Sequence, residues 1–164
     1  KPSLVFSVSD SLTTKFLSIL NNVPVFPLYY SGLTKFTPIH ASDVSDLVYE
    51  IIIKEIHSKS IEAIGPEVLT FKQIIEILLE CIDKKRLLIP LPLTIAKLSA
   101  SVLQMLPNPL ITLDQLRLLK YDNIKSENGI TNFELGHESK INFKDGVMKY
   151  AYNWRDGGQY SIRK

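Results

Sequence analysis

The sequence predicts an α/β fold made of a few short strands and several helices. Short runs of consecutive apolar residues have the length of strands, and apolar residues recur at helical spacing between these runs. Residues that typically cap helices stand at the junctions. Strands that alternate with helices are typical of α/β folds, and no linker is long enough to separate two domains. We therefore expect residues 1–164 to form a single domain.

The first expected strand spans residues 1–8, where Leu4, Val5 and Phe6 are consecutive apolar residues. A strand that is apolar on both faces is typical of the inside of a parallel sheet. Nothing before it in the sequence can pair with it, and an unpaired apolar strand promotes aggregation. The chain also begins with Lys1 rather than Met. We therefore expect a processed or partial chain.

The segment after this strand should form a helix that ends at residue 22. Ser9, Asp10 and Ser11 are candidates for its N-cap, because their side-chain oxygens can accept hydrogen bonds from free backbone N–H groups. Residues 23–35 contain two prolines and a glycine, and we expect them to form a loop.

A second helix is expected after an extended piece at residues 36–40. Ser42 or Asp43 can cap it, and its apolar residues form a stripe at helical spacing. The stripe consists of Val44, Leu47, Val48, Ile51 and Ile52. A short strand is expected at residues 61–64.

Thr70 and Gln73 form a capping box, which predicts the start of a third helix. Residues 86–91 are expected to be extended, and further helices should open at Thr94 and at a second capping box, residues 112–115. The remaining residues, 121–164, are predicted to be a partly irregular tail that contains a final helix capped by Asn142.

Composition excludes several classes of function. The 19 basic and 17 acidic residues give a net charge of +2, so we expect no attraction to nucleic acid. The single cysteine, Cys81, excludes an internal disulfide and indicates a reducing compartment. Four prolines interrupt the weakly charged stretch at residues 87–113, which is therefore too short to span a membrane as a helix. That stretch would suit peripheral contact with a membrane or a partner.

Few residues indicate chemistry. The seven glycines form neither GxGxxG nor a P-loop, so the chain has no phosphate-binding loop of its own. The three histidines are too scattered for a metal site, and no catalytic residue is predicted. His40 is expected either to be hydrogen-bonded locally at a strand end or to face a pocket. Tyr121 and Lys125 match the YxxxK pattern, but they follow a helix in a polar stretch, which favours a structural interpretation.

Several segments resemble the second half of the extended and atypical short-chain dehydrogenase/reductases, the family of NAD-dependent epimerases and dehydratases. KPSLVFSVSD (residues 1–10), FTPIHASDVSDLV (36–48) and IEAIGPEVLTFKQIIEIL (61–78) are similar to three segments of that half. LPNPLITLDQLRLLKYDN (106–123) and the tail around Trp154 resemble the branch that contains the nucleotide-binding accessory subunit of respiratory complex I and its bacterial relatives. The resemblance covers nearly all of this chain.

The resemblance implies a Rossmann-like fold whose nucleotide-binding first half is not in this sequence. It also implies NAD or NADP as the cofactor of the full-length protein, whereas no cofactor is expected for this chain alone. Pro2 and Ser3 would lie on the nicotinamide side of that cofactor, and residues 24–32 and His40 would border a substrate pocket. Ser7-Val8 stand where the family usually has Gly-Pro. This departure implies that the nicotinamide would not be positioned as it usually is in the family.

Three functions follow as hypotheses. In the leading one, the protein is an accessory or assembly element of respiratory NADH:quinone oxidoreductase. Its partners would be the missing first half and complex I subunits, on the matrix side of the mitochondrial inner membrane or at the periphery of a bacterial inner membrane. The second is an active NAD(P)-dependent reductase or epimerase that acts on a nucleotide sugar or a lipid-like substrate. The third is a free-standing interaction module or a non-functional remnant.

Overall fold

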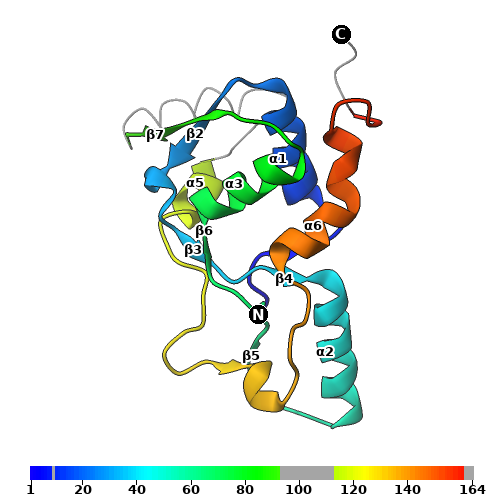
Figure 1. The fold of residues 1–164 in the computed structure, drawn as a ribbon. Helices are drawn as coiled ribbons and strands as arrows, with labels where there is room; N and C mark the ends of the chain where they lie inside the picture. Colours follow the sequence, from blue (N-terminus) through cyan, green and yellow to red (C-terminus); the bar gives the residue numbers. More distant parts are fainter. Residues whose placement is uncertain (9, 93–112, 161–164) are drawn as a thin grey trace.

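The computed structural model describes residues 1–8, 10–92 and 113–160. It shows the predicted α/β fold, with several helices and short strands (Figure 1). The helices are α1 (Ser11–Asn22), α2 (Ala41–Ile53), α3 (Phe71–Cys81), α5 (Leu113–Leu118) and α6 (Phe143–Ala151). The strands are β1 (Val5–Phe6), β2 (Val25–Tyr29), β3 (Lys35–Phe36), β4 (Ile39–His40), β5 (Ile61–Glu62), β6 (Leu69–Thr70), β7 (Leu87–Leu91) and β8 (Ile130–Thr131). The helix expected at Thr94, the capping residue Thr112 and the candidate cap Ser9 lie outside the described residues.

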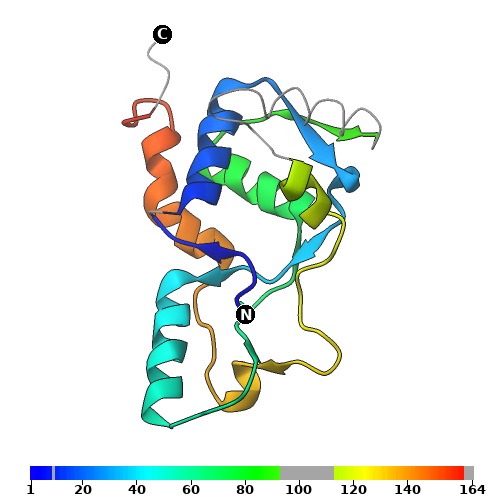
Figure 2. The same cartoon turned by 180° about the vertical axis from the view of Figure 1, so that it is seen from behind.

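The strands of the described ranges form pairs rather than one continuous sheet. Three pairs are parallel, namely β1 with β4, β2 with β7 and β5 with β8, whereas β3 and β6 run antiparallel. Figure 2 shows β1 and β4 between the body that holds α1, α3 and α6 and the part that holds α2. Strand pairing therefore links these two regions of the chain.

The first strand is parallel, as predicted, but it is shorter than residues 1–8. The reason is a change of partner: Ser3 N–H donates to the carbonyl of Ala63, whereas the Leu4 carbonyl accepts from Ile39 N–H. Residues 1–6 therefore pair first with the end of β5 and then with β4. Within the described ranges, β1 has a strand neighbour on one side only.

The expectation of a loop over residues 23–35 is wrong, because Val25–Tyr29 form β2 and Tyr30–Gly32 form a 3-10 turn. Pro27 of β2 lies opposite Ile89 of β7, and Leu28 lies opposite Pro90. Proline removes a backbone donor, which excludes it from a central strand but not from the outer edge of a pair. Both prolines are thus compatible with a two-stranded parallel ladder.

Helix α2 begins earlier than expected, because His40 and not Ser42 or Asp43 is its N-cap. The Nδ1 atom of His40 accepts a hydrogen bond from Ser42 N–H at 3.2 Å. The Asp43 carboxylate instead accepts from the backbone N–H groups of Lys140 and Ile141. Asp43 therefore fixes a remote segment against α2.

Of the other predicted N-caps, those of α1 and α3 are confirmed by side-chain hydrogen bonds, and that of α6 is confirmed in position only. Asp10 caps α1 by accepting from Leu12 and Thr13 N–H, and the Thr70–Gln73 capping box of α3 is present in both directions. Asn142 occupies the N-cap position of α6, but its side chain makes no capping hydrogen bond.

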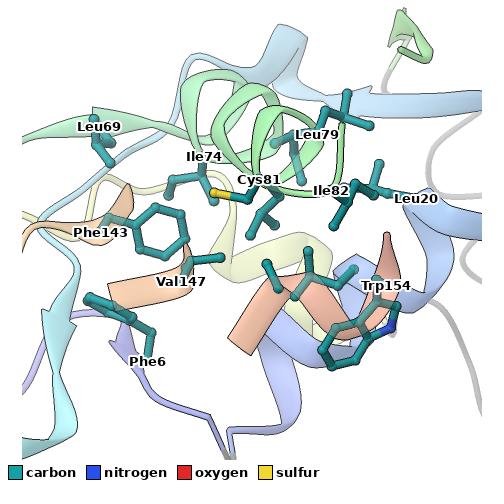
Figure 3. Close-up of a cluster of buried hydrophobic side chains, with 14 of the residues drawn as sticks. Phe6, Leu20, Leu69, Ile74, Leu79, Cys81, Ile82, Phe143, Val147 and Trp154 are labelled. Atoms are coloured by element: carbon teal, nitrogen blue, oxygen red, sulfur yellow. The ribbon is translucent and has the colours of Figure 1, made fainter. Parts of the chain in front are cut away.

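The main core lies where α1, α3 and α6 meet (Figure 3). Phe6 of β1 packs against Phe143 of α6 in a T-shaped arrangement, with ring centroids 4.9 Å apart. Gly146 permits this approach, because a Cβ atom there would lie 2.6 Å from the Phe6 ring. The absence of a side chain at Gly146 therefore lets the Phe6 ring pack directly against α6.

A second, smaller cluster supports α2 and contains Ile39, Leu47, Ile61 and Ala63. Only Leu47 of the five residues in the predicted apolar stripe is fully buried, and Val48 and Ile52 are exposed. The helix therefore buries a narrower face than its periodicity suggests. None of the helices in the described ranges is both long and apolar enough to cross a bilayer.

Candidate functional site

An apolar cavity of about 470 Å³ lies between α1, β2, β3 and the start of α3. Its α1 wall is formed by Leu12, Phe16 and Ile19, which are spaced four and three residues apart and so share one helix face. Phe71 and Ile74 of α3 also line it. Its volume is within the range of small-molecule sites, about 300–1,000 Å³.

Three phenylalanines give this cavity a fixed wall. The ring of Phe16 meets those of Phe26 and Phe71 edge-on, at centroid distances of 6.0 and 5.7 Å. Edge-to-face contacts restrict how the rings turn. α1, β2 and α3 are therefore held together at the wall by aromatic packing.

Polar groups in the cavity lining are largely engaged with the chain. The Thr13 hydroxyl lies 2.7 Å from the Tyr150 hydroxyl and also donates to the Asp10 carboxylate. Burial raises the pKa of Tyr150 far above its usual range, so the phenol is neutral at physiological pH. The Asp122 carboxylate accepts from Lys35 N–H at 2.8 Å.

Ser3, a predicted cofactor-binding residue, lies beside this cavity. Its hydroxyl is buried, donates to the carbonyl of Asn123 at 2.8 Å and accepts from Thr37 N–H at 3.2 Å. Asn123 and the neighbouring Leu4 both line the cavity. The other predicted residue, Pro2, is exposed and forms an isolated bridge with Ala63. A role for Pro2 and Ser3 at a cofactor stays a prediction.

The structure separates the two predicted parts of the substrate pocket. Residues 24–32 contribute Val25, Phe26, Pro27 and Tyr29 to the lining. His40 is not among the lining residues, because its ring caps α2 and meets the Phe6 ring edge-on at 5.2 Å. A pocket role for His40 stays a prediction.

Sequence reasoning missed the α1 wall for a physical reason. Leu12, Phe16 and Ile19 have the helical spacing that predicts a core-facing stripe, and a cavity wall has the same spacing. Neither composition nor periodicity distinguishes a helix face that packs in the core from one that lines a cavity. Only the position of Phe26 and Phe71 relative to α1 shows that part of this face lines a hollow.

Two other candidates have structural roles. Tyr121 and Lys125 are not on one helix, and the Lys125 ammonium forms an ion pair with Glu134. Cys81 is buried in the main core, and burial raises the pKa of its thiol to about 11. In the part of the chain that the structure describes, no group of three or more potential ligands is arranged to hold a metal ion.

The residues present do not fit the phosphates of a dinucleotide. Such a site needs glycines where the backbone approaches phosphate. Here the close approaches of Gly32, Gly65 and Gly146 are to Lys72, Pro38 and Phe6 of the same chain. These glycines serve internal packing, and a phosphate site would have to come from other residues.

Comparison with known proteins gives one sequence relative. The chain is 27% identical, over an alignment of 172 residues, to the mitochondrial NADH dehydrogenase (ubiquinone) 1 alpha subcomplex subunit 9 of Arabidopsis thaliana. The alignment covers 96% of this chain and 42% of that protein. No family model matches the chain.

Solved structures share the fold at low identity. The protein gox2253 has a TM-score of 0.62 at 15% identity, over 99% of this chain and 49% of its own. GDP-mannoheptose C4 reductase from Campylobacter jejuni has a TM-score of 0.57 at 15% identity, over 93% and 47%. UDP-glucose 4-epimerase from Thermotoga maritima has a TM-score of 0.54 at 11% identity, over 92% and 44%.

The chain spans slightly less than half the length of the relatives it matches. This coverage agrees with the resemblance, which assigns the chain to one half of a longer protein. In sequence and in fold, the chain therefore resembles the extended and atypical short-chain dehydrogenase/reductases, on the branch of the complex I subunit.

Proposed function

We propose that this chain is the substrate-side part of an NAD(P)-binding protein that acts as an accessory or assembly element of respiratory NADH:quinone oxidoreductase. The relationship to the plant subunit over 96% of the chain carries this proposal. That relative is mitochondrial, which favours the matrix side of the inner membrane, or the membrane periphery in a bacterium, as the location. The other complex I subunits would be the partners.

The proposal assigns cofactor binding and substrate binding to different halves of a longer protein. NADP is bound in the Campylobacter reductase and NADPH in a Pseudomonas aeruginosa protein of similar fold. Since Gly32, Gly65 and Gly146 serve internal packing and the seven glycines form no phosphate-binding motif, the other half would bind the cofactor phosphates. Pro2 and Ser3 would pass the nicotinamide side, and the apolar cavity would face the substrate.

A titration tests the cofactor assignment. NADPH and NADH are titrated into the protein expressed from its complete reading frame and, separately, into residues 1–164. We expect tight binding only by the longer protein. Tight binding by residues 1–164 would contradict the division of work, and absence of binding by both would contradict the cofactor.

Native electrophoresis of membranes tests the accessory role. We expect the protein to migrate with assembled NADH:quinone oxidoreductase, and its depletion to reduce the amount of assembled enzyme. Migration away from the enzyme, together with normal assembly after depletion, would refute the role. This experiment is independent of the cofactor titration.

A second candidate is an active NAD(P)-dependent reductase or epimerase. The fold similarity to the Campylobacter reductase and the Thermotoga epimerase favours it. Such activity needs a Tyr-x-x-x-Lys pair upstream of Lys1, because Lys125 is paired with Glu134 and does not act with Tyr121. If the complete reading frame lacks that pair, this candidate is excluded.

A further inference from the structure

We propose that the cavity between α1, β2 and α3 binds the hydrocarbon chain of a long-chain fatty acyl group. This inference deepens the proposed function, because it takes the cavity as the substrate side of that protein. It distinguishes a lipid-like ligand from a nucleotide sugar. The elements that form most of the cavity lie together in the upper part of Figure 1.

The cavity wall is chemically suited to methylene groups. Its lining comes mainly from leucine, isoleucine, valine and phenylalanine side chains on five separate elements, namely α1, β2, β3, α3 and α5. Burial of hydrocarbon against such a wall is favourable in proportion to the apolar area removed from water. An apolar site of this kind tends to exclude water and to accept apolar guests.

Among the lining residues that the structure describes, few hydrogen-bonding groups are free to bind a sugar. The Asn123 carbonyl already accepts from Ser3 and Thr37, and the Thr13 hydroxyl is shared with Tyr150 and Asp10. Lys15 and Tyr29, which also line the cavity, have interactions within the chain. Hydroxyls buried here would lack partners, which is costly. A nucleotide sugar therefore fits this wall poorly.

One part of the lining is exposed to water, where the head of an amphiphile can stay hydrated. Tyr121 is exposed, and Asp122 forms an exposed hydrogen bond with Lys35. Exposure at these residues indicates that this part of the lining faces water, whereas Ile74 and Phe71 are buried. An acyl chain would thus lie against α1 and α3 with its polar end in the water beside the exposed Tyr121.

The test uses cis-parinaric acid, a fluorescent 18-carbon fatty acid, with the protein expressed from its complete reading frame. We expect saturable binding that palmitate competes away and that UDP-glucose does not. Absence of saturable binding would overturn the proposal, because another part of the longer chain would then fill the cavity. Displacement by UDP-glucose would also overturn it.

Substitutions locate the bound fatty acid. Val25 lines the cavity and is 42% exposed, so Val25→Asp should fold while placing a carboxylate beside the chain. We expect its affinity for parinaric acid to fall about tenfold or more. Val48→Asp is the matched control, because Val48 is 49% exposed and lies outside the lining. Equal binding by both variants would overturn the proposal.

A second pair of substitutions tests the proposal if Val25→Asp fails to fold. Leu118 lines the cavity and Leu33 does not, and they are 71% and 68% exposed. Leu118→Asp should weaken parinaric acid binding relative to Leu33→Asp, and no difference in this pair would overturn the proposal. NADPH binding is measured in parallel. If the full-length protein binds parinaric acid in competition with palmitate but does not bind NADPH, the proposed function is contradicted. If it binds NADPH but not parinaric acid, only the fatty acyl ligand is contradicted.

Discussion

The hydroxyl of Ser3 donates a 2.8 Å hydrogen bond to the backbone carbonyl of Asn123, 120 positions later in the chain. The same oxygen accepts from Thr37 N–H at 3.2 Å. One buried side chain therefore joins the segment before β1, the segment between β3 and β4, and the edge of the apolar cavity. The contact places a predicted cofactor residue at a structural junction.

Replacement of Ser3 by alanine should lower the free energy of unfolding by about 1 kcal/mol, because both hydrogen bonds of its hydroxyl are lost while Thr37 N–H keeps its bond to the Asn123 carbonyl. Urea denaturation followed by circular dichroism measures the change. Ser45→Ala is the control, since the Ser45 hydroxyl is exposed and bonds only to the preceding turn of α2. An equal effect of the two substitutions would show that the Ser3 contact does not stabilise the junction.

The start of α6 gives a second prediction. The Phe143 N–H donates to the Glu67 carboxylate at 2.7 Å, whereas the Asn142 side chain makes no capping hydrogen bond. Glu67→Ala should therefore cost about 1 kcal/mol of stability, as loss of a cap does. Asn142→Ala should change stability by less than about 0.5 kcal/mol. Urea denaturation that gave the opposite order would show that Asn142 is the cap.

These helix starts show which parts of the fold the sequence could predict. The Thr70–Gln73 box is visible in the sequence because both partners lie within one turn. Glu67 is 76 positions from the N–H that it caps, so no local pattern indicates it. Asp43 likewise serves backbone groups almost a hundred positions away. Local contacts are predictable from spacing, whereas contacts between remote segments depend on the fold.

The candidate site divides in the same way. The resemblance indicated that residues 24–32 border a pocket, and β2 does line the cavity. It did not indicate Phe16 or Phe71, because their spacing fits an ordinary core. The β1 segment was predicted to be parallel, but its change of partner from Ala63 to Ile39 has no sequence signal. Strand length was therefore overestimated.

A third prediction concerns two glycines. A Cβ atom at Gly65 would lie 1.6 Å from the Pro38 carbonyl oxygen, so Gly65→Ala must displace the backbone before β4. We expect a loss of about 3 kcal/mol or more. Gly136→Ala is the comparison, because Gly136 has a φ of +78° and nothing within 4 Å of such a Cβ. It should cost only about 1 kcal/mol, from backbone strain. Thermal unfolding that ranked Gly136→Ala as the worse change would contradict this contact.

The final prediction concerns the reactivity and the pH dependence of Cys81. Burial raises the pKa of its thiol to about 11, so below pH 9 the native thiolate fraction should be roughly a hundredfold smaller than in the unfolded chain. A disulfide reagent should accordingly label native protein far more slowly than urea-unfolded protein at pH 8. Fast labelling of the native protein would show that Cys81 is accessible.

The same shift makes stability depend on pH in one direction. Well below pH 9, at about pH 7 and lower, the thiol is protonated in both states, so its ionisation has no effect on folding. As the pH rises toward 11, the unfolded chain loses the proton while the native chain keeps it, and this difference favours unfolding. The stability difference between the parent protein and Cys81→Ala should therefore shrink from pH 8 to pH 11. Because both proteins carry the same other groups, including Tyr150, a constant difference would mean that the Cys81 thiol titrates alike in the native and unfolded states.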